Sequence, residues 1–229
     1  MSEKSTNKYA IVDLEATSAS STACIIQVGI VIMQNGRVID EFASDVNPHQ
    51  KLDNHIVHLT GITDQQLSQA PDFSEIARTI FELIEDCIFV AHNVKFDANL
   101  LAEALFMEGF ELRTPRVDTV ELAQVFYPTL EQYNLSYLSR VLNLDLAQAH
   151  TAIEDARATG KLLLHLMDKI ASLPRQTIDM LLTFSDNLLF ESELVIRDAI
   201  KGKTNSLSKE YIMLEESGIL SLIHISEPT

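Results

Sequence analysis

Two carboxylates lie two residues apart near the N-terminus, where Val12-Asp-Leu-Glu-Ala-Thr17 follows a short apolar run. Residues i and i+2 of a strand point to the same face, so Asp13 and Glu15 are expected to project together from the end of that strand. Paired carboxylates of this kind can bind a metal ion. An acidic chain also contains Asp-x-Glu pairs by chance, so the pair alone does not define a site.

A third carboxylate, Asp97, follows a buried-strand pattern and the segment His92-Asn-Val-Lys-Phe96. Asn93 suits the N-cap of the next helix, which places Asp97 in about its first turn, where the helix dipole favours an anion. An Asp that only decorates a helix start would give the same pattern.

The segment His150-Thr-Ala-Ile-Glu-Asp155 combines a candidate general base with a fourth carboxylate. Thr151 and Glu154 have capping-box spacing, which predicts a helix that begins just after Thr151 and leaves His150 outside it. Two helical residues five apart would point about 140° apart, whereas a His in the preceding loop can face the same site as Asp155. The alternative is a surface His beside a helix cap.

The four carboxylates indicate a specific chemistry when they are taken together. Carboxylates gathered at strand ends and helix starts repel one another unless cations lie among them. Oxygen ligands select hard ions such as Mg²⁺ or Mn²⁺, and two such ions about 4 Å apart can clamp the attacking and leaving oxygens of a phosphodiester. A His near its usual pKa can then accept a proton from the attacking water.

The elements that must position these residues predict an α/β fold with a mixed sheet flanked by helices. Val- and Ile-rich strands are expected over 9–12, 23–34, 37–46 and 87–91, and Asn35-Gly36 is a strong hairpin signal between the second and third. Residues 53–63 are irregular or form a short helix. Helical spacing of apolar residues predicts helices over 72–85, 96–107, 118–126, 135–142, 152–170 and 175–200.

The three motifs, in this order and spacing, resemble those of the DnaQ-like superfamily of 3′→5′ exonucleases, DEDDh branch, over about 8–166. Thr60-Gly-Ile-Thr63 is similar to a further segment common in that family. The resemblance implies an RNase H-like (ribonuclease H-like/exonuclease) sheet and two divalent metal ions, Mg²⁺ or Mn²⁺. It also implies the release of nucleoside monophosphates from a 3′ end.

The resemblance also implies roles for individual residues, carried over by position. His150 is implied as the general base. Asp13 is implied to bridge both metals, and Asp97 to serve the second, partly through water. The metal ligands are implied to be Asp13, Glu15, Asp97 and Asp155. The residues that contact or shape the pocket of the terminal nucleotide are implied to be Thr17, His92, Asn93 and Phe96. Ala16 and Ser18 depart from the family's frequent Thr and Gly, which affects the grip on the strand end.

Composition limits how nucleic acid can bind. The formal net charge of −16 over 229 residues counts against a protein that covers a long stretch of nucleic acid. It is compatible with a nuclease that holds a few nucleotides through metal ions, helped by local cations at Lys95, Arg113, Arg116 or Arg157. Two isolated cysteines and no apolar run of signal-peptide or membrane-spanning length predict a cytoplasmic protein with no membrane partner.

Pro174 marks a predicted boundary. We expect an exonuclease domain over 8–170, a helical appendage or connector over 171–220, and a non-native tail over 221–229. Gly202-Lys-Thr204 is not a phosphate-binding loop, because position 197 is Arg where that motif needs its first Gly.

More narrowly, the chain resembles exonuclease domains fused ahead of DinG-like helicases in some bacteria. The predicted function is therefore a metal-dependent 3′→5′ exonuclease that acts on single-stranded 3′ ends of DNA in repair or replication, with a covalent helicase domain as partner in the intact protein. Two alternatives stay open. One is an exoribonuclease or oligoribonuclease that takes RNA, and the other is an inactive domain that binds partners through its acidic surface.

Overall fold

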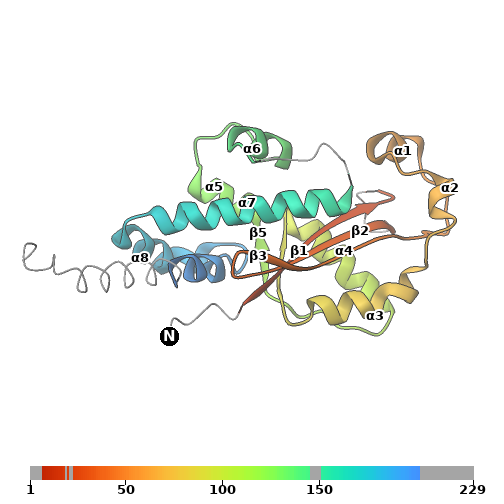
Figure 1. Cartoon of the computed structure of the whole chain (residues 1–229), viewed down its shortest axis with the longest axis horizontal. Helices are drawn as coiled ribbons and strands as arrows, with labels where there is room; N and C mark the ends of the chain where they lie inside the picture. The colour runs from red at the N-terminus through yellow and green to blue at the C-terminus, as the bar shows by residue number, and fades with distance from the viewer. Residues whose placement is uncertain (1–6, 19, 21–22, 145–150, 202–229) are drawn as a thin grey trace, which may run out of the picture.

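A five-stranded mixed sheet forms the centre of the protein (Figure 1). The computed structural model describes residues 7–18, 20, 23–144 and 151–201. The strand order is β3-β2-β1-β4-β5, in which β1 to β3 are antiparallel while β4 and β5 run parallel to β1. The expected mixed sheet is confirmed. The strands are β1 Lys8–Ala16, β2 Ile25–Gln34, β3 Arg37–Asp45, β4 Ile88–Ala91 and β5 Arg116–Asp118.

The predicted hairpin joins β2 to β3. Asn35 and Gly36 have φ angles of 52° and 72°, so both lie in the left-handed region that a two-residue hairpin turn requires. The turn sets the register, because Gln34 pairs with Arg37 directly across it. The ladder then shifts by one residue between Ile32 and Met33, and beyond this irregularity Gln27 of β2 lies opposite Asp45 of β3.

Helices cover both faces of the sheet (Figure 1). On one face α3 (Phe73–Ile84) and α4 (Val94–Met107) share a core with Ala10 and Val12 of β1. On the other, α5 (Thr119–Phe126), α6 (Leu135–Val141) and α7 (Ala152–Ser172) share a core with Tyr9 and Ile11. Because side chains alternate along a strand, the row that begins with Tyr9 and Ile11 continues into Asp13 and Glu15 on the α7 face.

Two short helices lie beyond the end of β1 (Figure 1). They are α1 (Asn54–Thr60) and α2 (Asp64–Leu67), joined at Gly61, whose φ of 74° ends α1. Within the stretch 53–63, which was predicted to be irregular or a short helix, residues 54–60 form a helix. A small core of Ile26, Leu52, Ile62 and Leu67 attaches both helices to β2.

The chain after Pro174 packs against the nuclease core. It forms α8 (Arg175–Phe184), a 3₁₀ turn η1 (Ser185–Asn187) and helical residues 193–201. The stretch expected to be helical over 175–200 is helical in these parts and interrupted between them, where Glu121 of α5 accepts hydrogen bonds from the Leu189 backbone and the Ser192 hydroxyl, both at 2.6 Å. Within the described residues, every helix is too short or too polar to cross a bilayer.

Candidate active site

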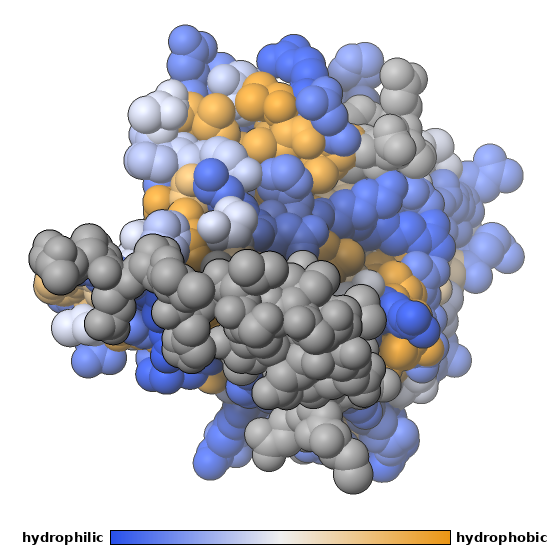
Figure 2. All heavy atoms as spheres, turned by 60° about the vertical axis from the view of Figure 1, so that its left-hand side comes forward, coloured by the Kyte–Doolittle hydropathy of each residue, from blue (hydrophilic) through white to orange (hydrophobic). Residues whose placement is uncertain are grey.

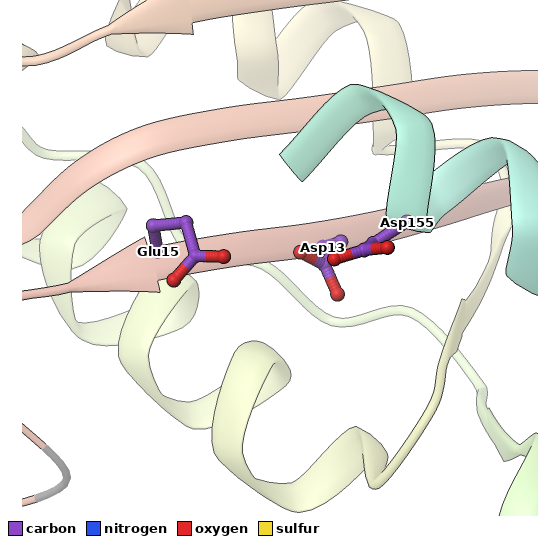
Figure 3. A group of neighbouring side chains, drawn as sticks. All are labelled: Asp13, Glu15 and Asp155. Carbon is purple, nitrogen blue, oxygen red and sulfur yellow. The ribbon is translucent and has the colours of Figure 1, made fainter. Parts of the chain in front are cut away.

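Three carboxylates meet where the end of β1 lies beside the start of α7. Asp13, Glu15 and Asp155 each offer an oxygen, and these oxygens lie within 4.8 Å of one another (Figure 3). Asp13 and Glu15 project together from β1, as their spacing predicts, and Asp155 approaches from the first turn of α7. The structure thus brings together residues that are about 140 positions apart in the chain.

Gly29 of β2 allows α7 to approach this closely. It pairs with Asp13 across the sheet, and a Cβ at this position would lie 2.2 Å from the carbonyl carbon of Ala152, the first residue of α7. Such a distance is far inside van der Waals contact, so only glycine fits. Sequence reasoning missed this residue, although a glycine inside a Val- and Ile-rich strand is a recognised signal of close backbone approach.

The start of α7 is not capped in the predicted way. The helix begins at Ala152 with Thr151 as N-cap, as expected, but the Thr151 side chain makes no capping hydrogen bond. Glu154 is paired with Arg157, which also bonds Glu41 of β3 at 3.0 Å. The predicted capping box is therefore wrong: Glu154 pairs with Arg157 in the same helix, and the Thr151 side chain makes no capping bond.

Asp97 lies in the first turn of α4, as predicted, but outside the tight group of three. Its side chain is 5% exposed, and its Oδ1 accepts the Leu14 backbone N–H at 3.0 Å. The β1–β4 ladder ends at Ile11 and Val90, so this amide lies past the last paired strand residue and is satisfied by the carboxylate instead. Asp97 thereby ties α4 to the strand between Asp13 and Glu15.

The electrostatics of the group favour a cation. Burial, followed by the charges of Asp97, Asp155 and Glu15, raises the pKa of Asp13 well above its ordinary value. Burial is also the main cause that raises the pKa of Asp97 to about 7, against the hydrogen bond from Leu14. A set of crowded, oxygen-only ligands whose charges oppose one another fits hard divalent ions such as Mg²⁺ and Mn²⁺.

A cleft of about 400 Å³ opens beside Glu15. Two predicted pocket residues, Thr17 and Phe96, line it, and the Thr17 hydroxyl is held by the Cys24 backbone N–H at 3.0 Å. The N-cap of α1 and residues along that helix also line the cleft, and the three motifs do not contain them. They are Asp53, His55, Ile56 and Leu59.

The other two predicted pocket residues support the frame of the site. The His92 Nε2–H donates to the Tyr133 carbonyl at 2.8 Å, and its Nδ1 lies 2.9 Å from the Thr119 hydroxyl. Burial lowers the His92 pKa, which keeps the ring neutral. Asn93 holds the N-cap position of α4 in a left-handed conformation (φ 74°), and its backbone N–H donates to Asp118. Its side chain gives no capping bond, contrary to prediction.

The predicted phosphate-binding cations differ in their surroundings. Lys95 lines a second cleft of about 470 Å³, which shares Phe96 and contains Asn93. The three arginines each have a protein partner: Arg113 pairs with Glu111, Arg116 donates to Asn99, and Arg157 pairs with Glu41 and Glu154. His150, the predicted general base, lies outside the described residues, and its role stays a prediction.

The family described as RNase_T, Exonuclease, matches residues 10–163. The chain belongs to this exonuclease family. It is 34% identical over 224 residues to the 3'-5' exonuclease DinG of Staphylococcus aureus strain USA300, a match that covers 96% of this chain and 25% of DinG. The same identity and coverage hold for DinG of strain COL. The chain thus spans about a quarter of the length of these curated relatives.

Solved structures of exonucleases share the fold. Exonuclease X in complex with 5′-overhanging duplex DNA matches with TM-score 0.57 and 20% identity, over 70% of this chain and 91% of that one. Exonuclease I matches with TM-score 0.65 and 17% identity, over 78% and 44%. The nuclease domain of 3′hExo, a DEDDh family member bound to rAMP, matches with TM-score 0.61 and 16% identity, over 70% and 92%. The predicted RNase H-like exonuclease fold is confirmed.

Proposed function

We propose that this chain is a two-metal 3′→5′ exonuclease that hydrolyses the phosphodiester bond at a DNA 3′ end and releases nucleoside monophosphates. The observation that carries the proposal is the position of Glu15, which belongs to the carboxylate group and also lines the 400 Å³ cleft. A cleft of this volume is within the range that encloses a small ligand, of roughly 300–1,000 Å³. The scissile bond of a nucleotide in the cleft would then lie beside the carboxylates.

In this proposal Asp13, Glu15 and Asp155 hold one divalent ion, and Asp97 serves a second, partly through water. When bound, the ions polarise the phosphoryl oxygen and stabilise the charge that develops on the attacking and leaving oxygens. The other residues of the site position the substrate and the elements that carry the carboxylates. Thr17 and Phe96 hold the terminal nucleotide, while the Leu14–Asp97 hydrogen bond fixes α4 relative to β1.

His150 is proposed as the general base on the sequence motif. It must be neutral to accept the proton of the attacking water, so the rate should rise through its pKa, within about a unit of 6.5, and then level off. His150→Ala should reduce kcat by about 10²–10⁴ and lose that step while remaining metal-dependent. Thr151→Ala is the matched control. An unchanged rate and profile in His150→Ala would place the base elsewhere.

The direct test is digestion of single-stranded DNA and RNA of the same sequence, labelled at either end, with Mg²⁺, Mn²⁺ or EDTA. We expect DNA to be shortened from the 3′ end only, with monophosphates as products and no activity in EDTA. Circular single-stranded DNA should stay intact. Faster digestion of RNA would favour the exoribonuclease alternative, and a chain without metal-dependent cleavage would be the inactive interaction domain.

We also propose that the chain is the nuclease part of a longer exonuclease–helicase that works on DNA in the cytoplasm, in repair or replication. The match to DinG covers 96% of the chain, whereas the exonuclease family match ends at residue 163, so the likeness extends past the nuclease motifs. On this proposal 8–170 is the nuclease, 171–220 connects it to the helicase, and 221–229 is a non-native tail.

The connector has a folded part with an apolar surface. On the α8 side of the molecule, hydrophobic patches lie among hydrophilic residues (Figure 2). Within 175–201, the exposed large apolar side chains include Met180, Phe184 and Leu189. Ile178 and Val195, in contrast, are buried in the core that α7 shares.

Truncation after residue 174 should therefore expose apolar core and cost several kcal/mol of unfolding free energy, since each buried side chain contributes about 1.5–3 kcal/mol. Urea unfolding of residues 1–174 against the full chain measures this. Equal stability would show that residues 175–201 add no net stability to the nuclease core.

A further inference from the structure

We propose that Gln27 is a positioning residue for the reaction: it fixes the start of α7 and thereby holds Asp155 against Asp13 and Glu15. The inference rests on the nuclease function proposed above and adds to it an uncharged residue of β2 that none of the three motifs contains.

The first step is the hydrogen bond at the helix start. The first N–H groups of a helix have no partner within the helix and need an acceptor from elsewhere. The Thr151 side chain does not provide one for α7. Instead the Gln27 Oε1 accepts the Ala152 N–H at 2.8 Å, across 125 positions of the sequence. Ala152 is the first residue of α7, three positions before Asp155.

The second step is the orientation of the Gln27 amide. Its Nε2 donates to Asp45 Oδ1 at 2.7 Å, and the other oxygen of Asp45 accepts from the Gln66 Nε2 of α2, also at 2.7 Å. An amide has one acceptor end and one donor end. Because Asp45 can only accept when ionised, it turns the Nε2 toward β3 and leaves the Oε1 facing Ala152.

The third step is the location of this contact relative to the carboxylates. On β2, Gln27 pairs with Glu15 and Gly29 pairs with Asp13. Gly29 lets the backbone of Ala152 rest against β2, and Gln27 bonds the N–H of the same residue. The two strand positions opposite the β1 carboxylates therefore also fix the helix that carries Asp155. A shift of about 1 Å in a reacting group can cost roughly 10²-fold in rate.

Gln27→Leu tests the proposal because it removes the acceptor and keeps a side chain of similar size. We expect kcat to fall, or the metal concentration for half-maximal rate to rise, by roughly 10–100-fold, as for other residues that orient metal ligands. The KM for single-stranded DNA should change by less than about threefold, since Gln27 is not a lining residue of the cleft beside Glu15. Gln34→Leu, at the far end of β2, is the matched control and should behave as wild type in these three parameters.

A second readout does not depend on activity. In the metal-free protein, amide hydrogen exchange at Ala152 should be faster in Gln27→Leu than in wild type, while exchange in β4 stays unchanged. A general loss of stability would accelerate exchange in both places and would contradict a positioning role.

If Gln27→Leu does not fold, a pair of substitutions that exchanges the carboxylate and the amide between positions 27 and 45 still tests the proposal. Gln27→Glu retains an acceptor for Ala152 but opposes the carboxylate of Asp45, and adding Asp45→Asn restores a donor to that contact. The double variant should be at least about tenfold more active than Gln27→Glu alone.

Wild-type kcat and metal dependence in Gln27→Leu, or equal activity of the single and double variants, would overturn the proposal. If the wild type itself shows no metal-dependent cleavage, the proposed function fails. The Ala152 exchange rates then report separately on whether Gln27 holds the helix start.

Discussion

Carboxylates lie at both ends of strand β1, on the same face of the sheet. At its start Tyr9 contacts Asp198, which belongs to the helical residues near the end of the described chain. At its other end the strand carries Asp13 and Glu15, which face Asp155. The two groups share a strand and a face and differ in what surrounds the negative charge.

At the start of β1, donors surround a single carboxylate. Asp198 is 5% exposed and accepts hydrogen bonds from the Tyr9 hydroxyl at 2.7 Å and the Asn7 amide at 2.9 Å, while Lys201 lies 3.1 Å away. Burial and the carboxylate of Asp198 together raise the pKa of Tyr9, which keeps the phenol a donor. This arrangement stabilises the folded state, because the buried charge has both a cation and neutral donors.

At the far end of β1, carboxylates surround carboxylates. Burial and three neighbouring charges raise the pKa of Asp13, so the ionised form of this carboxyl is disfavoured in the metal-free protein. Local stability is therefore lower at the proposed cation site and is maintained at the opposite end of the strand. The comparison predicts that the same chemical change, removal of one carboxylate, has opposite effects on stability at the two ends.

Asp13→Ala should have the largest effect on activity. Loss of the ligand proposed to bridge both ions removes several kcal/mol of transition-state stabilisation, or about 10³-fold or more in rate. The same change relieves like-charge repulsion, so the metal-free variant should unfold at a higher temperature than wild type. Single-turnover digestion and thermal unfolding in EDTA measure the two effects. Activity within tenfold of wild type would refute the two-metal assignment.

Gly29→Ala should come next, because it moves the site without changing a carboxylate. The added Cβ would lie 2.2 Å from the Ala152 backbone, so α7 must shift away from β2 and carry Asp155 with it. We expect roughly 10²-fold lower kcat and a loss of about 1–3 kcal/mol of stability. Gly109→Ala, where nothing lies within 4 Å of the new Cβ, is a control for glycine replacement, although its φ of 86° adds strain. Normal activity in Gly29→Ala would show that α7 adapts.

Asp198→Ala should reverse the pattern of Asp13→Ala. It leaves the buried Tyr9 hydroxyl without its acceptor, which costs about 1–3 kcal/mol of unfolding free energy. The rate per folded molecule should be unchanged at low temperature, because the contact lies at the opposite end of β1 from the carboxylate group. Urea unfolding and active-site titration separate the two quantities. A lower kcat with unchanged stability would mean that the two ends of the strand are coupled.

Sequence predicts the parts of this comparison that depend on local patterns. The Asn35-Gly36 hairpin, the i and i+2 placement of Asp13 and Glu15, and the helix over Phe73–Ile84 follow from periods and turn residues that lie within a few positions. The three-residue strand β5 was missed, because so short a segment carries no period. It forms because Val117 is buried beside β4.

The parts that sequence did not predict depend on long-range contacts. The Thr151–Glu154 spacing fits a capping box, but Glu154 pairs with Arg157, whose guanidinium is also held by Glu41 of the distant strand β3. Gln27 accepts the Ala152 N–H at the start of α7 from 125 positions away, and sequence spacing does not predict a contact over that distance. In the sequence, Asp198 has the pattern of an exposed helical residue, and only the fold brings it within hydrogen-bonding distance of Tyr9.

The smallest expected effect is a pH dependence of stability between acid and neutral pH, which arises at the end of β1 that carries Asp13 and Glu15. The folded-state pKa of Asp97 is about 7, against an ordinary value of 3.8. Between these values the folded protein binds more protons than the unfolded chain, so this group stabilises the fold most below pH 4, and the contribution is lost as pH rises through 7.

In EDTA, wild-type stability should therefore fall from pH 5 to pH 8 more steeply than that of Asp97→Asn, which cannot titrate; Asp13 shifts in the same direction, so some slope should remain. Asp179→Asn, at an exposed position on α8, is the control and should keep the wild-type slope. Urea unfolding at several pH values measures these slopes. Saturating Mg²⁺ should reduce this loss of stability with rising pH, because a metal ion binds the ionised carboxylates and stabilises the fold as they deprotonate. Parallel slopes for wild type and Asp97→Asn in EDTA would show that Asp97 is already ionised in the metal-free fold, and that the Leu14 hydrogen bond outweighs its burial.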